Sequence, residues 1–485
     1  MFDVEKSIAQ ANGLFNALVG YVRGAGQAHK AYQVEVKVFR DVLAMGLQLM
    51  GIWFETKAGG DVGQALATEA GQVLPREALK RRRYIMVFGE LELPRWYYHG
   101  DEGPGLFPLD EAADLPESTY SYFVQDLLGQ GVAGKTYDEV LADFEKLFGF
   151  RPPKHTLEEM VPAAAADADP YYEALGVPSP KTEADLLVAA VDGKGVPMVK
   201  EKPAERRVRL GKGEKLSRTK EAVVAAVYTI EPQVRTPEEI VAEVRDKEPP
   251  AQRPKPQNKR VRATLHGKED AFAAVAAEVE RRDPRGEKQR VCLMDGSRAL
   301  WVLALATLKR FKFILDLFHA LEYLWKAAYV FHAEGSPEAE EFVRHRLLLL
   351  LKGKVGYVIG GLRQMLTKHR KALRASQRKT LETVIGYYER NRRWMRYDDY
   401  IAAGYPIGSG AVESACRHLV KDRMEGSGMR WTVAGAEGVL KIRAVHLNGD
   451  WTPFWQFHMK QQTQRRFAVC RWTPVPSVSR AKAAG

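Results

Sequence analysis

The chain of 485 residues is 45% hydrophobic and 28% charged, so we expect most of it to fold around buried cores, in roughly two to four domains. Its formal net charge of +12 favours an anionic partner, either nucleic acid or an acidic membrane surface. Three cysteines far apart in sequence argue against a secreted disulfide scaffold. The lack of a signal peptide, and of any apolar run near the ~20 residues that span a bilayer, predicts a cytoplasmic protein without a membrane segment.

The first third of the chain is expected to be mainly helical. Residues 1–75 form an N-terminal helical region, because apolar residues recur at helical spacing from Tyr32 to Phe54. Over Arg81–Tyr98 the pattern changes to alternation rich in Val, Phe, Tyr and Trp, which predicts a β-hairpin within residues 76–115. Residues 116–180 hold three short helical patterns separated by glycines. They fit a helix-turn-helix-like DNA-binding region, although any small helical bundle has the same pattern.

Strands and helices alternate from residue 181 onward. The apolar run LLVAAVD predicts a strand ending at Asp192, with Val196–Val199 returning as a second strand and residues 222–230 forming a third. A helix is expected to start at Thr236–Glu239, which supplies a capping residue, a proline and first-turn acids. The basic, proline-containing residues 251–263 are expected to form a loop.

The alternation continues with a helix over residues 268–282. The apolar run VCLMD predicts a strand that ends in Asp295, and a further strand is expected over Phe311–Phe318. Residues 319–395 have helical patterns almost throughout. After the glycine- and proline-containing loop GYPIGSG, a helix is expected from about Val412 to Met424.

These elements predict an α/β fold, because strands and helices alternate. Residues 181–319 hold the first part of this α/β region, and residues 320–400 form an all-helical segment. Residues 401–460 complete the α/β region with the last helix, and residues 461–485 form a C-terminal tail.

Three carboxylates stand at the ends of these elements. Asp192 and Asp295 each close an apolar strand, and catalytic groups gather at strand ends in open α/β sheets. Two such strands side by side would bring the two carboxylates together, which is costly unless a cation lies between them. Glu413, in the first turn of the last helix, is the candidate third ligand. The three residues would hold two Mg²⁺ ions, for which Mn²⁺ could substitute.

Each of these residues also has a purely structural interpretation. A strand-terminal Asp is often a turn former or a helix cap. Glu413 could interact with the helix dipole or with Arg417 one turn later. Asp316, expected within a strand, is a rival for the second position. The agreement of order, strand ends and helix favours Asp192, Asp295 and Glu413 as catalytic metal ligands.

Four blocks of the sequence occur in the order found in one family of transposases. They are VDGKGVPMV (191–199), CLMDGSRALW (292–301), FILDLFHALEYLW (313–325) and GYPIGSGAVESACRHLVKDRMEGSGMRWTVAGAEGVLKIRAVHLNGDW (404–451). From about residue 80 to 456 the chain resembles the ISKra-type family of bacterial insertion-sequence DDE transposases.

The resemblance implies a ribonuclease-H-like mixed-sheet catalytic core with an all-helical insertion, preceded by a mainly helical DNA-binding region. Matching motifs assign Asp192 as the first Asp, Asp295 as the second and Glu413 as the Glu. The 118 residues from Asp295 to Glu413 are long for a minimal core and accommodate the insertion. The family often carries a Cys-x-x-Cys pair before Pro-Leu-Asp (108–110). Gly100 and Gly103 stand there instead, so no zinc is expected and the hairpin must be held by packing alone.

Basic residues near the triad are the candidates for DNA contacts, because phosphate contacts position DNA without reading its bases. The predicted DNA-binding residues are Lys194, Arg206, Arg207, Arg209, Lys212, Arg417, Lys421, Arg430 and Trp431. Trp431 could stack on an unpaired base or simply pack helices together. The structural alternative for the basic segment between residues 200 and 220 is a solvated surface loop.

The triad and the resemblance together predict a DNA transposase, cytoplasmic and nucleoid-associated in a bacterium. It would bind the terminal inverted repeats of an insertion sequence and catalyse metal-dependent strand cleavage and strand transfer into target DNA, as a homodimer or larger assembly on double-stranded DNA. One alternative is another ribonuclease-H-fold nuclease, which would cleave without joining strands. The other is a catalytically inactive DNA-binding protein, which would bind without metal-dependent cleavage.

Overall fold

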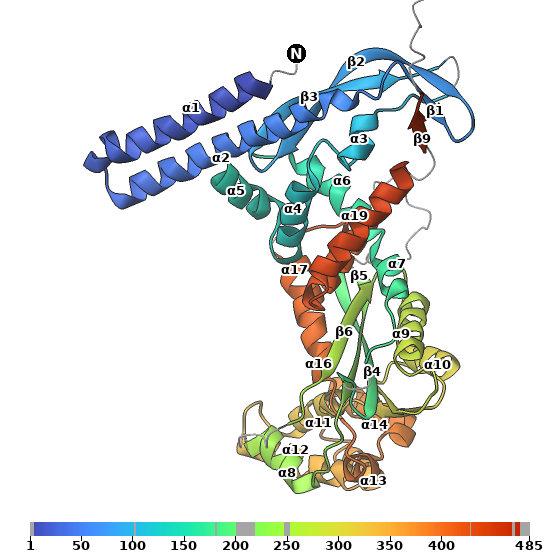
Figure 1. The fold of residues 1–485 in the computed structure, drawn as a ribbon. Coiled ribbons are helices and arrows are strands. Elements are labelled where there is room, and N and C mark those ends of the chain that lie inside the picture. The colour runs from blue at the N-terminus through green and yellow to red at the C-terminus, as the bar shows by residue number, and fades with distance from the viewer. Residues whose placement is uncertain are drawn as a thin grey trace, which may run out of the picture. The chain divides into compact units, whose positions relative to one another are not determined.

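The computed structural model describes residues 4–100, 103–179, 182–199, 219–246, 253–426, 428–467 and 471–475. Contacts divide the chain into two compact units, which are treated separately below. Unit 1 comprises Met1–Glu173 with Asp450–Gly485, and unit 2 comprises Ala174–Gly449. Figure 1 shows the elements of both. Among the described residues, no helix has the length and apolarity that crossing a bilayer requires.

Unit 1 combines helices with a four-stranded sheet of order β3-β2-β1-β9. Its strands are β1 (Ala65–Thr68), β2 (Val73–Met86), β3 (Gly89–Tyr98) and β9 (Trp472–Pro474). Its helices are α1 (Val4–Arg23), α2 (Ala31–Thr56), α3 (Pro108–Ala112), α4 (Tyr122–Gly134), α5 (Tyr137–Phe148), α6 (Lys154–Ala165), α7 (Ala168–Ala174) and α19 (Trp451–Phe467), with short 3-10 helices η1 (Ala25–Ala28) and η2 (Ala58–Gly60).

The β-hairpin expected over Arg81–Tyr98 is present as β2 and β3, although β2 begins earlier, at Val73. The three short helices expected after it are α4, α5 and α6. In contrast, β1 lies in a region for which the sequence predicts only helices. A strand of four residues is too short to show a period of two, so the pattern alone could not reveal it.

Two apolar clusters hold the hairpin of unit 1. One joins α2 to β2 and β3 through Phe54, Tyr84, Met86, Leu93 and Leu115. The other consists of Leu66, Leu74 and Tyr98, which are all 1% exposed or less. Burial of such side chains stabilises the folded chain by about 1.5–3 kcal/mol each.

Unit 2 contains a mixed five-stranded sheet of order β6-β5-β4-β7-β8. Its strands are β4 (Leu186–Pro197), β5 (Thr219–Ile230), β6 (Gln257–Thr264), β7 (Gln289–Met294) and β8 (Phe311–Leu315). The strands β6, β5 and β4 pair antiparallel, whereas β7 runs parallel to β4, and β8 runs parallel to β7. The expected α/β fold with a mixed sheet is therefore confirmed.

Helices surround this sheet. They are α8 (Pro237–Val241), η5 (Ala242–Asp246), α9 (Lys268–Arg282), α10 (Arg298–Thr307), α11 (Leu317–Phe331), α12 (Pro337–Leu351), α13 (Val355–Lys368), α14 (Ala375–Asn391), η6 (Arg392–Trp394), α15 (Tyr397–Ala402), α16 (Gly410–Ala415), η7 (Cys416–Lys421), α17 (Asp422–Met424) and α18 (Val433–Leu447). Figure 1 shows α9 and α10 on one side of the strands and α16 on the other. The expected helices over 268–282 and through 319–395 are confirmed by α9 and by α11 to α14.

Three predictions for unit 2 were wrong in detail. Val196–Val199 is not a returning strand, because β4 continues through Pro197 and pairs with β5 along its whole length. The loop expected over residues 251–263 contains most of β6, whose basic side chains mask a strand pattern at the edge of the sheet. The strand expected over Phe311–Phe318 stops at Leu315, because Asp316 caps α11.

Candidate active site

Three aspartates lie at the same level of three neighbouring parallel strands, Asp192 within β4, Asp295 directly after β7 and Asp316 directly after β8. In the β4–β7 and β7–β8 ladders, the final residue pairs directly precede Asp192, Asp295 and Asp316. Neighbouring strands lie about 4.8 Å apart, so the backbones of Asp192 and Asp295 are adjacent, and that of Asp316 is one strand further. The structure therefore brings together the two aspartates that the sequence predicts as metal ligands.

Buried apolar runs place these aspartates. Leu187–Val191 in β4 and Val291–Met294 in β7 are at most 1% exposed, as is usual for strands that are covered on both faces. The carboxylates come next, where β7 and β8 end. Asp192 and Asp295 are partly exposed, whereas Asp316 is completely buried. Two of the three are thus accessible to a substrate or an ion.

The Asp192 carboxylate is held by its own backbone and by the helical segment that follows α16. The Gly193 N–H donates to Asp192 Oδ1 at 2.7 Å, and the Cys416 thiol donates to Oδ2 at 3.4 Å. A Cβ atom at Gly193 would lie 2.3 Å from a carboxylate oxygen of Glu221, so a larger residue here would displace the end of that side chain. Glu221 is thereby a further carboxylate beside the site, one that the sequence pattern did not single out.

Asp295 is oriented by the loop that follows β7 and by the helical insertion. The Ser297 N–H donates to Asp295 Oδ1 at 2.7 Å, and the Tyr387 hydroxyl of α14 donates to the Asp295 carbonyl at 2.8 Å. Burial is the main cause that raises the pKa of Asp295, and the negative charges of Asp192 and Glu221 add to it. The carboxylate is therefore under electrostatic strain, which a bound cation would relieve.

Glu413 lies on α16 and faces the same cluster. The Ser409 hydroxyl, just before the helix, donates to Glu413 Oε1 at 3.2 Å. Desolvation, followed by the charge of Asp316 and more weakly that of Asp192, raises the pKa of Glu413. Because Cys416, less than one turn away, contacts Asp192 directly, the helix is anchored against the first aspartate. After α16 the chain continues directly as the π-helix η7, a local distortion that is frequent at functional sites.

Asp316, the rival in the sequence, has a different environment. Its Oδ2 accepts the His319 backbone N–H at 2.9 Å and contacts His319 Nδ1 at 2.7 Å, and its Oδ1 accepts the Ser409 N–H at 2.6 Å. It is the N-cap of α11 and joins β8 to the start of α16. These contacts give Asp316 a positioning role for Glu413 that the sequence pattern did not reveal.

His319 supplies positive charge to the cluster. Burial disfavours its charged form, but the hydrogen bond and charge of Asp316, with the charges of Asp192 and Asp295, raise the pKa of His319 to about 9. One ligand atom each of Asp316, His319 and Glu413 lies within 4.8 Å of the others. A protonated imidazole cannot bind a metal, so at neutral pH His319 acts as a counter-ion in the metal-free protein.

We expect Asp316→Asn to lower the pKa of His319 by about one to three units in metal-free protein, because an opposite charge at this distance contributes that much. A raised histidine pKa stabilises the fold fully below the unfolded value of 6.5, and this contribution is lost as pH rises through about 9. The variant should therefore lose stability below pH 9 relative to the parent. Titration of the imidazole signals by NMR measures the shift, with His446 of α18 as the internal control. An unchanged His319 midpoint would contradict the assignment.

The described residues place five of the nine predicted DNA-binding residues. Arg417 and Lys421 on η7 are exposed, as is Arg430. Lys194 on β4 forms an ion pair with Glu425 at 3.4 Å. The Trp431 indole N–H donates to the Met424 carbonyl at 3.1 Å, and the Trp431 backbone pairs with Pro197 and Val199 at the end of β4. These contacts are those of a packing residue. Arg206, Arg207, Arg209 and Lys212 lie outside the described residues.

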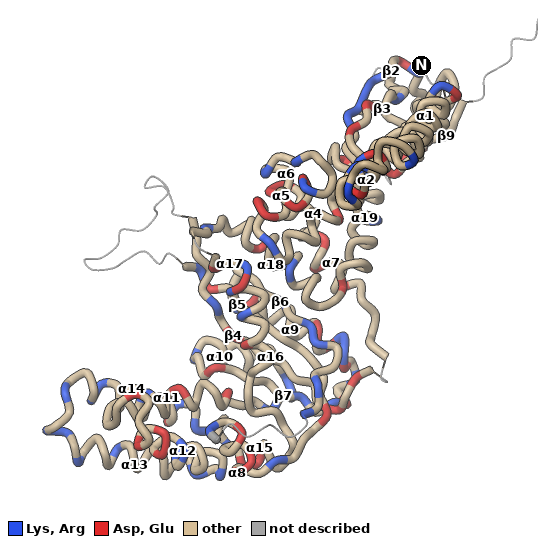
Figure 2. Tube along the Cα trace, turned by 90° about the vertical axis from the view of Figure 1, so that its left-hand side faces the viewer, with Lys and Arg blue, Asp and Glu red and all other residues tan. Residues whose placement is uncertain are grey.

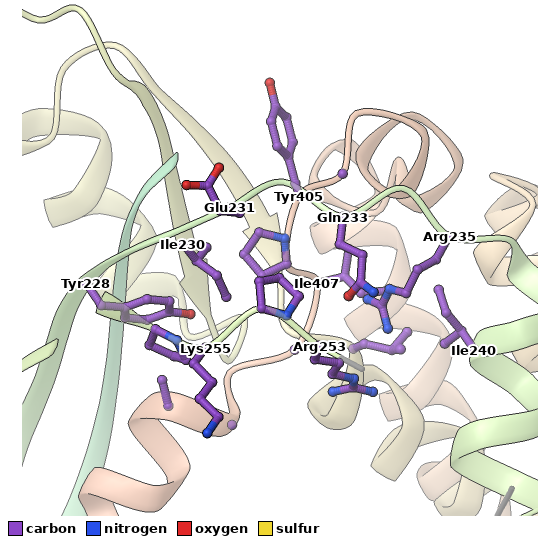
Figure 3. A pocket seen from close by; sticks show the side chains of 18 of the residues that line it. Tyr228, Ile230, Glu231, Gln233, Arg235, Ile240, Arg253, Lys255, Tyr405 and Ile407 are labelled. Carbon is purple, nitrogen blue, oxygen red and sulfur yellow. The ribbon is translucent and has the colours of Figure 1, made fainter. Parts of the chain in front are cut away.

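A cavity of about 540 Å³ lies beside α16 in unit 2 (Figure 3). Tyr228 of β5, Phe318 of α11 and Tyr405 from the loop before α16 contribute aromatic surface to it. Arg253, Lys255 and Lys259 supply cations, and Arg253 is ion-paired with Glu243. Among the described residues, neither of the two exposed lysines has an ion-pair partner. Aromatic surface bordered by free cations suits a nucleotide.

No protein-family model matches the chain. A search of curated proteins finds no match either.

Proposed function

We propose that the chain is a DDE-type DNA transposase whose catalytic core is ribonuclease-H-like and whose metal ligands are Asp192, Asp295 and Glu413. The observation that carries the proposal is the placement of Asp192 and Asp295 on adjacent parallel strands, with Glu413 on a helix anchored to the first of them. Three antiparallel strands followed by two parallel ones, connected through α9 and α10, support a core of this kind.

The donor set suits hard divalent cations. Asp192, Asp295 and Glu413 offer carboxylate oxygens, which Mg²⁺ and Mn²⁺ prefer. Burial is the largest cause that raises the pKa of Asp295 and of Glu413, and the charge of Asp192 adds to both shifts, so a bound cation would stabilise the charged forms of these carboxylates. Bound there, Mg²⁺ would activate water or a 3′-hydroxyl and neutralise charge on a phosphodiester.

The chain's own residues orient this chemistry. Ser297 and Tyr387 fix the second aspartate, and Ser409 holds the carboxyl group of Glu413. The buried Asp316 couples the start of α11 to the start of α16, so the glutamate helix keeps its position relative to the sheet. The exposed cations Arg417 and Lys421, on the helical segment after Glu413, are placed to contact DNA phosphates.

The proposal is tested with DNA that carries the sequences flanking the protein's own gene, incubated with purified protein and Mg²⁺ or Mn²⁺. Strand cleavage followed by joining of the new 3′ end to a second duplex supports the transposase. Cleavage without joining would favour a nuclease of the same fold. DNA binding without cleavage in either metal would favour a catalytically inactive DNA-binding protein.

We expect Lys255→Ala combined with Lys259→Ala to weaken DNA binding and to flatten its salt dependence. Each phosphate contact contributes about 0.9 to the slope of log affinity against log salt, so the double variant should lose roughly two units of slope. Fluorescence anisotropy of a labelled duplex over a series of salt concentrations measures this. The matched control is Lys255→Arg with Lys259→Arg, which keeps both charges and should keep the slope. An unchanged slope in the alanine variant would show that Lys255 and Lys259 do not contact DNA phosphates.

A further inference from the structure

The helical hairpin of α1 and α2 in unit 1 is stabilised internally by one apolar stripe. On α1, Val4, Ser7, Ala11, Leu18 and Tyr21 are the less exposed positions, at the spacing of three and four residues that faces one partner helix. Leu18 is the large apolar side chain of α1 that becomes buried, whereas Phe54 of α2 packs on β2 and β3. On the first half of α2, Val34, Val38 and Asp41 are among the less exposed positions, so one stripe on each helix packs α1 on α2.

A second apolar stripe runs along α1 and faces solvent. Ile8, Phe15, Val19 and Val22 are all more than a third exposed and recur at intervals of seven, four and three residues. Asn12 occupies the remaining position of this heptad pattern. Single polar residues at such positions set the register of paired helices.

A matching second stripe runs along α2. Its exposed members are Tyr32, Val36, Phe39, Val42, Leu49 and Trp53. The spacing is again three, four or seven residues, so these side chains gather on one side of the helix. Both helices of the hairpin thus present a partner-facing surface that the rest of unit 1 leaves uncovered.

The apolar character of these exposed stripes indicates which kind of partner they would bind. From Ser7 to Val22 the helix α1 carries no charged residue, whereas Lys37, Arg40 and Asp41 lie on α2 (Figure 2 colours the charged residues of the chain blue and red). The exposed stripe of α1 itself contains no cation, so it offers no contact to the phosphates on which DNA binding depends.

The exposed area is that of a stable interface. Large apolar side chains exposed to this degree contribute roughly 100 Å² each, so the two stripes present on the order of 1,000 Å² per chain. A typical monomer exposes apolar patches of about 300–600 Å², and a standard interface buries about 800 Å² per partner. Two hairpins, each with one internal and one external stripe, complete a four-helix bundle around a twofold axis.

We propose that the α1–α2 hairpin is a dimerisation element, and that its occupant is the same hairpin of a second copy of this chain. The inference does not depend on the proposed chemistry. If both hold, the dimer would present two catalytic cores to the two ends of one DNA element.

The oligomeric state of the full chain tests the proposal. By light scattering with size-exclusion chromatography and by sedimentation velocity, the parent is expected to be a dimer at micromolar concentration without DNA. Phe15→Glu and Tyr32→Glu should each weaken dimerisation by at least about tenfold, because each places two charges in the apolar interface. The matched controls are Phe123→Glu and Tyr357→Glu, at side chains exposed to 57% and 74% against 54% and 74% for the test positions. Both controls should remain dimeric.

Helicity measured by circular dichroism shows whether the variants fold. If a glutamate variant does not fold, the milder substitution Val22→Gln replaces it in the dimerisation measurement. A parent that is monomeric throughout the micromolar range would overturn the proposal. A dimer that is unaffected by all three hairpin substitutions, or equally affected by the controls, would place the interface elsewhere. Parent protein that stays monomeric and binds vesicles would also overturn the dimerisation proposal. So would parent protein in which unit 2 of the same chain covers the hairpin. Exposure of α1 amides to hydrogen exchange, compared between parent and Phe15→Glu, identifies that last case.

Discussion

Asp192→Asn, Asp295→Asn and Glu413→Gln are each expected to lower the rate of metal-dependent DNA cleavage by at least about a thousandfold, while DNA binding persists. Each substitution removes one anionic oxygen ligand. The transition-state stabilisation that a metal contributes amounts to several kcal/mol, and about 4 kcal/mol corresponds to a factor of a thousand. The near-isosteric amides keep the side-chain volume, so the surrounding packing should be preserved.

The thermal stability of these variants without metal should not be lower than that of the parent. Unchanged or increased stability distinguishes a catalytic effect from misfolding. Burial and neighbouring negative charge raise the pKa of Asp295 and of Glu413. A carboxyl group whose pKa is raised by folding destabilises the native state at any pH above its unfolded value. Removing that charge therefore relieves repulsion at neutral pH, and the melting temperature without metal should be equal to or above that of the parent.

Two neighbouring carboxylates provide the controls. Glu221→Gln alters a charge beside Asp295 without touching the proposed ligand set, so cleavage should fall far less than in the triad variants. Asp316→Asn removes a buried cap and the partner of His319, so it should lower thermal stability, which the triad variants do not. Full cleavage by Asp295→Asn, together with none by a folded Asp316→Asn, would transfer the second position to Asp316.

The strands that position the site were predictable from the sequence pattern for a physical reason. A strand buried on both faces must be a continuous apolar run, so the acidic residue that ends the run is visible in the sequence. Asp192 directly follows the buried run Leu187–Val191 of β4, and Asp295 directly follows the buried run Val291–Met294 of β7. The capping box of Thr236 and Glu239 and the bounds of α9 were predictable because helix ends carry local chemistry.

The remainder of the site depends on contacts distant in sequence. Asp316 and Ser409 meet only because β8 ends beside the loop before α16. The charge of Glu221 acts on Asp295 because β5 pairs with β4 up to Pro197. The residues around Gly193 and Gly195 give no local sign of this register. Asp316 was expected in a strand, since a cap that directly follows apolar residues has the same local pattern as the end of a strand.

Asp110→Asn is expected to destabilise unit 1 by about 3–5 kcal/mol, the usual loss when one partner of a buried ion pair is removed. Asp110 is 2% exposed. Its Oδ2 accepts hydrogen bonds from Arg82 at 3.3 Å, Arg95 at 2.6 Å and Arg466 at 2.7 Å. These arginines come from β2, β3 and α19, so one carboxylate neutralises three cations and joins both ends of the chain within the unit.

Neutralising Asp110 would leave the buried Arg82 and Arg95 facing each other without a counter-charge. Burial already lowers the pKa of Arg82, with Asp110 opposing that effect, so the guanidinium depends on this carboxylate. Native-state hydrogen exchange measures the loss where it should occur, as faster exchange in β2 and β3 with unit 2 unchanged. Glu90→Gln is the matched control, because it removes the Arg83–Glu90 pair of the same hairpin, whose side chains are 62% and 44% exposed. Solvent screens that pair, so its removal should hardly alter exchange. Equal effects of the two substitutions would show that the hairpin is held by its apolar clusters alone, with Asp110 contributing nothing beyond an exposed ion pair.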